Sequence, residues 1–214
     1  MPKTKSFDEH SHEYDQWFDE HSEIYEAELA IIREFMRSYS GNGLEVGIGT
    51  GRFAIPLGIT TGIEPSAAMA AIAAKSGISV FSAIAEQLPF EDNQFDLVLM
   101  VTVICFLDDV LQAFKEAYRV LKPGGYILVG FIDKESVLGR QYMEKREKSL
   151  FYQDAVFYSA PEVLSFLRQA GFSSVMSKQT LIPASPNDTI LDGYGQGAFV
   201  VMQGIKDKNT NTIV

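Results

Sequence analysis

Three glycines at alternate positions interrupt an apolar run near residue 50, and their spacing is the clearest chemical feature of the chain. The stretch from Leu44 to Arg52 reads LEVGIGTGR. Its first residues predict a strand, and residues 53–57 predict a short helix. Glycine has no Cβ and tolerates positive φ, so such a turn lets a ligand lie against bare backbone. A strand, a glycine turn and a helix in this order predict a nucleotide-type site.

The position of the third glycine restricts the class of ligand. A dinucleotide fingerprint would need glycine at position 52, where the chain has Arg52, which we interpret as a solvated helix residue. Glu64 ends the next predicted strand, 19 residues after Glu45. An acidic side chain at this distance from the turn is placed to accept hydrogen bonds from ribose hydroxyls. The alternative is a surface glutamate in front of a proline.

Bulk properties exclude several classes of function. The chain has 214 residues, enough for one large core, and a net charge of −10, which argues against a nucleic-acid partner. Cys105 is the one cysteine, so no intramolecular disulfide can form. No apolar run reaches the ~18–20 residues that span a bilayer. We therefore expect a cytoplasmic protein without a membrane partner.

Strand and helix patterns alternate after residue 43. Apolar residues at helical spacing over 13–39 predict one or two helices, broken near His21, with Ser22 as a possible cap. The pattern predicts an α/β fold, a Rossmann-like, doubly wound sheet of seven mostly parallel strands with an antiparallel last strand, plus an N-terminal helical extension. The predicted strands cover 44–46, 59–63, 78–84, 95–104, 126–131, 172–180 and 197–203. The predicted units are an extension or lid (1–40), the main domain (41–205, with a variable substrate-side segment at 132–158) and a tail (206–214).

Two further stretches accompany the glycine turn, AIAEQLPF at 83–90 and RVLKPGG at 119–125. With E-x-G-x-G-x-G at 45–51, they resemble class I S-adenosylmethionine-dependent methyltransferases of the small-molecule type related to ubiquinone biosynthesis. The resemblance covers roughly residues 44–131 and implies S-adenosylmethionine as cofactor. Ile84 departs from the family pattern because it offers no side-chain acceptor to the adenine amino group, which leaves Glu86 or backbone for that role. The implied cofactor residues are Glu45, Gly47, Gly49, Thr50, Gly51, Glu64, Pro65, Ser66, Met69, Ile84, Ala85, Glu86 and Val101.

The methyl acceptor is expected where other segments converge over the strand ends. Candidate substrate residues are Tyr14, Trp17, Phe18, Thr102 and Phe106, with Tyr25, Ile104, Tyr142, Tyr152 and Phe157 as further candidates. Each aromatic residue could instead pack the extension onto the domain. Asp133 is a candidate general base, needed only if the nucleophile must lose a proton before attack. His10, His12 and His21 lie among acidic residues, which we interpret as a solvated stretch rather than a metal site.

The expected activity is transfer of a methyl group to a small-molecule acceptor by in-line displacement. Two alternatives stay open at this point. One is an NAD(P)-dependent oxidoreductase on a similar sheet, and the other is a non-catalytic S-adenosylmethionine-binding protein. The acceptor and the choice between monomer and homodimer are not fixed by these patterns.

Overall fold

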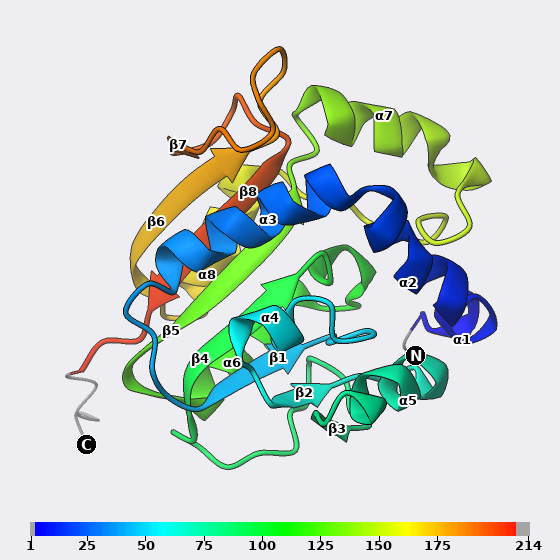
Figure 1. The fold of residues 1–214 in the computed structure, drawn as a ribbon. Coiled ribbons are helices and arrows are strands. Elements are labelled where there is room, and N and C mark those ends of the chain that lie inside the picture. Colours follow the sequence, from blue (N-terminus) through cyan, green and yellow to red (C-terminus); the bar gives the residue numbers. More distant parts are fainter. Residues whose placement is uncertain (1–2, 209–214) are drawn as a thin grey trace.

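The fold, described for residues 3–208 by a computed structural model, is a mixed sheet between two layers of helices (Figure 1). The eight strands described run in the order β3-β2-β1-β4-β5-β8-β6-β7. They are β1 (Gly43–Val46), β2 (Thr61–Ile63), β3 (Ser79–Phe81), β4 (Phe95–Val101), β5 (Leu121–Ile132), β6 (Ser173–Thr180), β7 (Leu191–Asp192) and β8 (Phe199–Ile205).

Most of the sheet is parallel. β1 pairs with β2 and β4, and β2 pairs with β3, all in parallel register. β8 lies antiparallel between β5 and β6, which confirms the predicted antiparallel last strand. β7 is an addition to the seven predicted strands, paired with the edge of β6. A strand of two residues carries no periodicity and cannot be predicted from a local pattern.

Helices cover both faces of this sheet. They are α1 (Lys5–Glu9), α2 (Ser11–Glu20), α3 (Ser22–Phe35), α4 (Ala54–Leu57), α5 (Ala67–Lys75), α6 (Val110–Val120), α7 (Val137–Lys145) and α8 (Ala160–Gln169), with 3₁₀ turns at Ile104–Phe106 and Arg146–Lys148. α3 and α4 pack with Leu97 and Leu99 of β4, whereas α6 and α8 pack with Val98 and Met100. β4 is therefore buried on both sides, as its apolar sequence predicted.

Side-chain caps fix where several helices begin. Ser66 accepts a hydrogen bond from the backbone of Met69, and Asp109 accepts one from Gln112. Ser159 forms a capping box with Glu162 at the start of α8. The helix break near His21 is confirmed, but the predicted Ser22 cap is wrong. His21 occupies the cap position without a side-chain hydrogen bond, and Ser22 is the first helical residue.

Other boundaries differ from the sequence patterns. β3 is shorter than the predicted strand at 78–84, and Ile104 lies in a 3₁₀ turn beyond β4. α7 was not predicted, because its apolar residues do not form one buried face: Val137 and Met143 are 52% and 40% exposed. Within residues 3–208, no helix is both long and apolar enough to cross a membrane. In the predicted tail, Lys206 is buried, and positions 209–214 lie outside the described residues.

Candidate functional site

The carboxyl ends of β1, β2 and β4 meet at one edge of the sheet and border an open cavity with about 140 Å³ of accessible space. Gly47, Glu64 and Thr102 each follow one of these strands and line the cavity. Ligands of open α/β sheets bind at such strand ends, where the strand order reverses. The cavity therefore lies at the position that the topology favours for a ligand.

The glycine turn packs closely against β2 and β4. Gly47 has a φ of 69° and Gly49 a φ of 57°, both in the left-handed region that favours glycine. A Cβ on Gly47 would lie 2.4 Å from Val103 Cγ2. Gly51 serves packing, since its Cβ would meet Ile78 at 2.8 Å and the residue lines none of the cavities described. Gly47 and Gly49 thus allow the backbone to form part of the cavity wall. Gly51 allows a helix to pack closely against the turn.

Glu64 is held in a fixed position at the end of β2. Its Oε2 accepts a hydrogen bond from the Gly49 N–H and its Oε1 accepts one from the Ser66 N–H, both at 2.9 Å. The side chain is 8% exposed, and burial raises its pKa. Each carboxylate oxygen has two acceptor positions, so each keeps one for a ligand. Glu64 can therefore accept two more hydrogen bonds without a change of rotamer.

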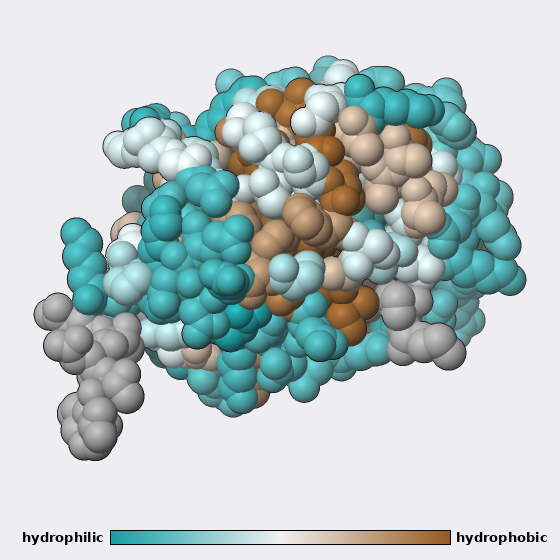
Figure 2. Space-filling model, turned by 90° about the horizontal axis from the view of Figure 1, so that it is seen from below, coloured by the Kyte–Doolittle hydropathy of each residue, from teal (hydrophilic) through white to brown (hydrophobic). Residues whose placement is uncertain are grey.

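The loop after β3 forms an apolar wall. Ile84 and Ala85 line the cavity together with Met69, Pro65 and Val101. Figure 2 views the molecule from the side of β3 and shows apolar residues gathered among hydrophilic ones. Ile84 is 37% exposed. It is the position that departs from the family pattern, and its side chain offers a ligand no polar group.

Glu86 also lines the cavity, but its carboxylate is already engaged. Its Oε1 accepts hydrogen bonds from the N–H groups of Asp108 and Asp109, at 2.9 and 3.2 Å. These bonds tie the loop after β3 to the start of α6. The side chain therefore holds the shape of this wall.

A smaller cavity with about 20 Å³ of accessible space lies beside the glycine turn and shares Tyr14, Gly47 and Thr102 with the large one. Glu45 and Thr50 line it. Glu45 is 2% exposed, its Oε2 has no hydrogen-bond partner among the described residues, and burial raises its pKa well above the usual range. Thr50 Oγ1 is buried near the Asp15 carboxylate but forms no hydrogen bond of normal geometry.

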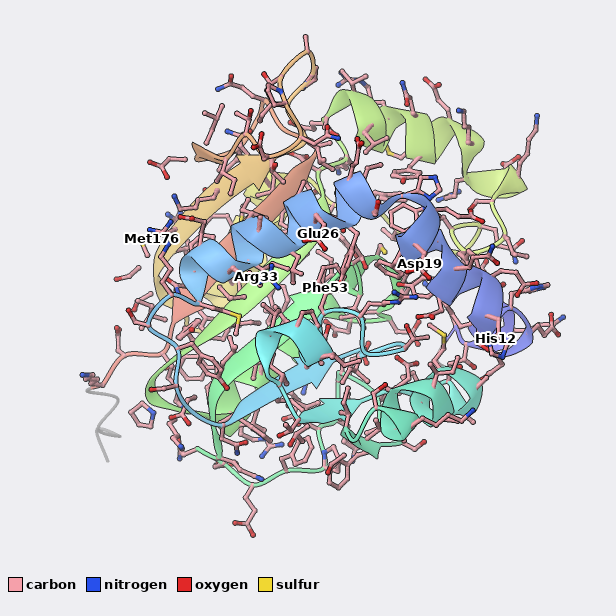
Figure 3. The ribbon with its side chains drawn as sticks, in the orientation of Figure 1. His12, Asp19, Glu26, Arg33, Phe53 and Met176 are labelled. Carbon is pink, nitrogen blue, oxygen red and sulfur yellow. The ribbon has the colours of Figure 1, made fainter. Side chains whose placement is uncertain are left out.

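The N-terminal helices close over both cavities. Arg52 is 25% exposed, and its guanidinium donates to Asp15 at 2.7 Å and to Asp19 at 2.8 Å, both on α2. Figure 3 shows Asp19 on the side of α2 that faces the glycine turn. The interpretation of Arg52 as a solvated residue is therefore wrong, because it anchors α2 to the turn.

α1 is attached at a second point. The Ser66 hydroxyl donates to Asp8 Oδ1 at 2.6 Å, and the Ala68 N–H donates to the same oxygen at 3.3 Å. The hydrogen bond from Ser66 lowers the pKa of Asp8. Ser66 itself lines no cavity described, so it acts on the site by capping α5 and holding α1.

The structure separates the candidate substrate residues into two groups. Tyr14, Thr102 and Phe106 line the large cavity, and Phe18 lines the small one. Thr102 has a φ of 52°, an uncommon conformation for a residue other than glycine.

Trp17 and Asp133 lie outside these walls. The Trp17 ring stacks on His21 with centroids 4.6 Å apart. Asp133 is 2% exposed, and its Oδ1 accepts a hydrogen bond from the Glu135 N–H at 3.0 Å. Over residues 3–208, no group of three His, Cys, Asp or Glu side chains gathers as a metal site.

Several wall residues were absent from the sequence prediction. They are Lys3, Thr4, Phe7, Val46, Ile63, Val103, Leu107 and Asp108. The Phe7 ring lies 5.6 Å from Tyr14 and 5.1 Å from Phe106. The seven-residue spacing between Phe7 and Tyr14 could have indicated that Phe7 belongs to the site, but the polar residues between them obscured this pattern.

Comparison with known proteins identifies the family that this site belongs to. A family model described as methyltransferase domain matches residues 44–129. A crystal structure of a SAM-dependent methyltransferase from Thermotoga maritima, described as a possible histamine N-methyltransferase, is 46% identical with a TM-score of 0.90. The alignment covers 95% of this chain and 100% of that one. The chain belongs to the S-adenosylmethionine-dependent methyltransferases.

Other relatives extend the comparison to further organisms. An uncharacterized protein of Methanocaldococcus jannaschii is 44% identical over 203 residues, covering 94% of this chain and 98% of the relative. A demethylmenaquinone methyltransferase of Chlorobaculum tepidum is 37% identical over 109 residues, covering 47% of this chain and 45% of the relative. The methyltransferase is thus related to quinone methyltransferases, and its cofactor is S-adenosylmethionine.

The residues at the two cavities fit this cofactor. Glu64 has acceptor positions left for a pair of hydroxyl groups, as a ribose carries. The unpartnered Glu45 Oε2 and the buried Thr50 hydroxyl suit the ammonium group of an amino-acid moiety. Ile84, Ala85 and Met69 offer apolar surface to a purine ring.

Proposed function

We propose that this methyltransferase transfers a methyl group from S-adenosylmethionine to a small-molecule acceptor inside the large cavity. The observation that carries the proposal is Glu64, fixed by two backbone N–H groups at the end of β2 with acceptor positions left over. In this proposal Glu64 holds the ribose, the loop at 84–86 receives the adenine, and the turn at 47–50 receives the amino-acid end.

The protein chain positions the reacting groups and excludes water from them. The bound cofactor supplies an electrophilic methyl group with a neutral leaving group, so the protein mainly holds the nucleophile in line. Tyr14 and Thr102 line both cavities, which supports a place for them beside the transferred group. α1 and α2 cover the site through Asp8 and Arg52 and so exclude solvent.

Similarity supports a small-molecule acceptor without fixing its chemistry. A malonyl-[acyl-carrier protein] O-methyltransferase of Marinomonas is 31% identical over 147 residues, whereas the Thermotoga neighbour is named for histamine. Cytoplasmic location, and assembly as a monomer or homodimer, are part of the proposal. The location is supported by the single cysteine, Cys105.

The test measures S-adenosylhomocysteine produced from S-adenosylmethionine with a protein-free metabolite extract. We expect product with the wild type and less with Glu64→Ala, assayed below saturation of the cofactor. Glu26→Ala, an exposed residue of α3, is the matched control and is expected to match the wild type. Binding of the cofactor without product, across the extract and a panel of pure acceptors, would instead support a non-catalytic binding protein.

A further inference from the structure

A groove beside α7 gathers positive charge on a protein whose net charge is −10. It has about 460 Å³ of accessible space and is formed by α7, at the periphery of the molecule (Figure 1), and by residues that flank this helix and precede α8. Its lining contains one carboxylate, Glu135, and three cations, Lys134, Arg140 and Arg146. A groove with an excess of one charge attracts a ligand of the opposite charge, so this groove is suited to an anion.

Two of the three cations have no carboxylate partner. Lys134 pairs with Glu162, with Nζ and Oε2 2.6 Å apart. Arg140 and Arg146 each donate only to a backbone carbonyl oxygen, and within residues 3–208 neither of them forms an ion pair. A guanidinium has five N–H donors, so each arginine keeps donors for an oxyanion.

The segment that precedes α8 joins the groove to the interior of the protein. The Ala155 carbonyl oxygen accepts a hydrogen bond from Arg146 at 3.2 Å, and the Val156 N–H donates to the Cys105 carbonyl oxygen at 2.8 Å. Val156 and Phe157 line the groove. These hydrogen bonds hold the segment between the arginine and the turn after β4.

A small apolar cavity shares Phe157 with the groove. It has about 20 Å³ of accessible space, and among the described residues that line it none carries a charged side chain. Thr102 lines this cavity and also the two cavities at the glycine turn, beside the proposed place of the transferred methyl group. A molecule that extends from Thr102 past Phe157 would therefore have an apolar body and would place its far end in the groove.

We propose that the groove binds an oxyanion, a carboxylate or a phosphate, that the methyl acceptor carries on an apolar body, with Arg140 and Arg146 as its binding partners. Guanidinium groups bind both kinds of oxyanion through paired N–H donors. Because the cavity beside Thr102 has no charged side chain, the anionic group lies at the end of the molecule away from the methylated atom. This inference rests on the proposed function and adds the chemical class of the acceptor.

The test compares two anions with a neutral ligand of the same chain length. Hexanoate, hexyl phosphate and 1-hexanol are titrated separately into the wild-type complex with S-adenosylhomocysteine and followed by ligand-observed NMR. We expect at least one anion to bind at least about fivefold more tightly than 1-hexanol, a modest preference because both arginines are exposed. Acetate and inorganic phosphate lack the apolar chain and should bind more weakly than their hexyl counterparts.

Three double variants locate the bound anion. The glutamine variant, Arg140→Gln/Arg146→Gln, should reduce the preference for the anion to less than about twofold. The lysine variant, Arg140→Lys/Arg146→Lys, keeps both charges and should retain more of the preference than the glutamine variant. The control variant, Arg33→Gln/Arg37→Gln, removes the same charge at exposed positions outside the groove and should keep the full preference.

A second measurement tests the link with the methyl acceptor. In the assay with metabolite extract, the glutamine variant should form less S-adenosylhomocysteine than the control variant at equal saturation with cofactor. The inference is overturned by equal binding of the anions and 1-hexanol, by acetate and phosphate binding as tightly as their hexyl counterparts, by an unchanged preference in the glutamine variant, or by equal product from the glutamine and control variants. The proposed function fails separately: the wild type would then form no product, whatever its preference for anions.

Discussion

Two buried carboxyl groups of the molecule are held in different ways. At the cofactor end, both oxygens of Glu64 accept hydrogen bonds from backbone N–H groups, which favour the charged form and partly offset the burial that raises its pKa. Glu28, in the middle of α3, is 5% exposed, and its carboxyl group makes no hydrogen bond among those described for residues 3–208. Glu64 is therefore held by backbone before a ligand binds, whereas Glu28 is an unfavourable buried group.

The largest expected effect is on the free energy of unfolding, and it distinguishes Glu28 from Glu64. The pKa of Glu28 is raised from 4.5 to about 8, so the folded protein holds this proton more tightly than the unfolded chain. Its unfavourable contribution is absent below pH ~4.5, grows as the pH rises and is complete above pH ~8. Glu28→Gln should therefore raise the free energy of unfolding at pH 9 by on the order of 2–4 kcal/mol.

Urea denaturation at pH 5 and pH 9 measures this effect. The gain should shrink at pH 5, where wild-type Glu28 is largely protonated in the folded state. Glu26→Gln is the control and should show no comparable dependence on pH. A Glu28→Gln variant equal in stability to the wild type at both pH values would show that Glu28 is not an unfavourable group.

The next effect concerns the cofactor end alone. Glu64→Ala should weaken binding of S-adenosylhomocysteine by about 1–3 kcal/mol, because it removes charge-assisted hydrogen bonds. Calorimetric titration measures the dissociation constant. Glu28→Gln should leave that constant unchanged, since Glu28 lines neither of the two cavities at the glycine turn. If both variants weakened the cofactor equally, the assignment of the ribose to Glu64 would be wrong.

The smallest effect concerns helix α2, which covers the site. Arg52→Ala removes the ion pairs with Asp15 and Asp19 and should lower stability by only about 1 kcal/mol, because the pairs are partly exposed. Hydrogen exchange should accelerate in the amides of α2 and stay unchanged in β4. Arg33→Ala, at an exposed position of α3, is the matched control. Unchanged exchange in α2 would show that Arg52 does not anchor the cover.

The same contrast explains which parts of the site could be predicted from the sequence. The glycine turn and Glu64 follow strands in a fixed order, so their positions could be predicted from local patterns, and the turn does lie at the cavity. Phe7 reaches the cavity, and Glu28 becomes buried, through packing of the N-terminal helices, which no local pattern encodes. Glu28 also looks like an ordinary solvated residue of an amphipathic helix, between Ala27 and Leu29.

The other features that were not predicted from the sequence have related causes. Arg52 looked solvated because its partners, Asp15 and Asp19, lie more than 30 positions earlier in the chain. α7 was missed because its exposed apolar residues produce no single face. Local chemistry such as the Ser66 and Ser159 caps was predictable, whereas contacts between distant segments required the structure.

Calorimetric titration of S-adenosylhomocysteine into the wild type and Glu64→Ala, side by side, tests the central claim most directly. The account predicts one site per chain in the wild type, with affinity reduced about fivefold or more in the variant. Binding that is absent from the wild type, or equal in the two proteins, would contradict the placement of the cofactor on Glu64.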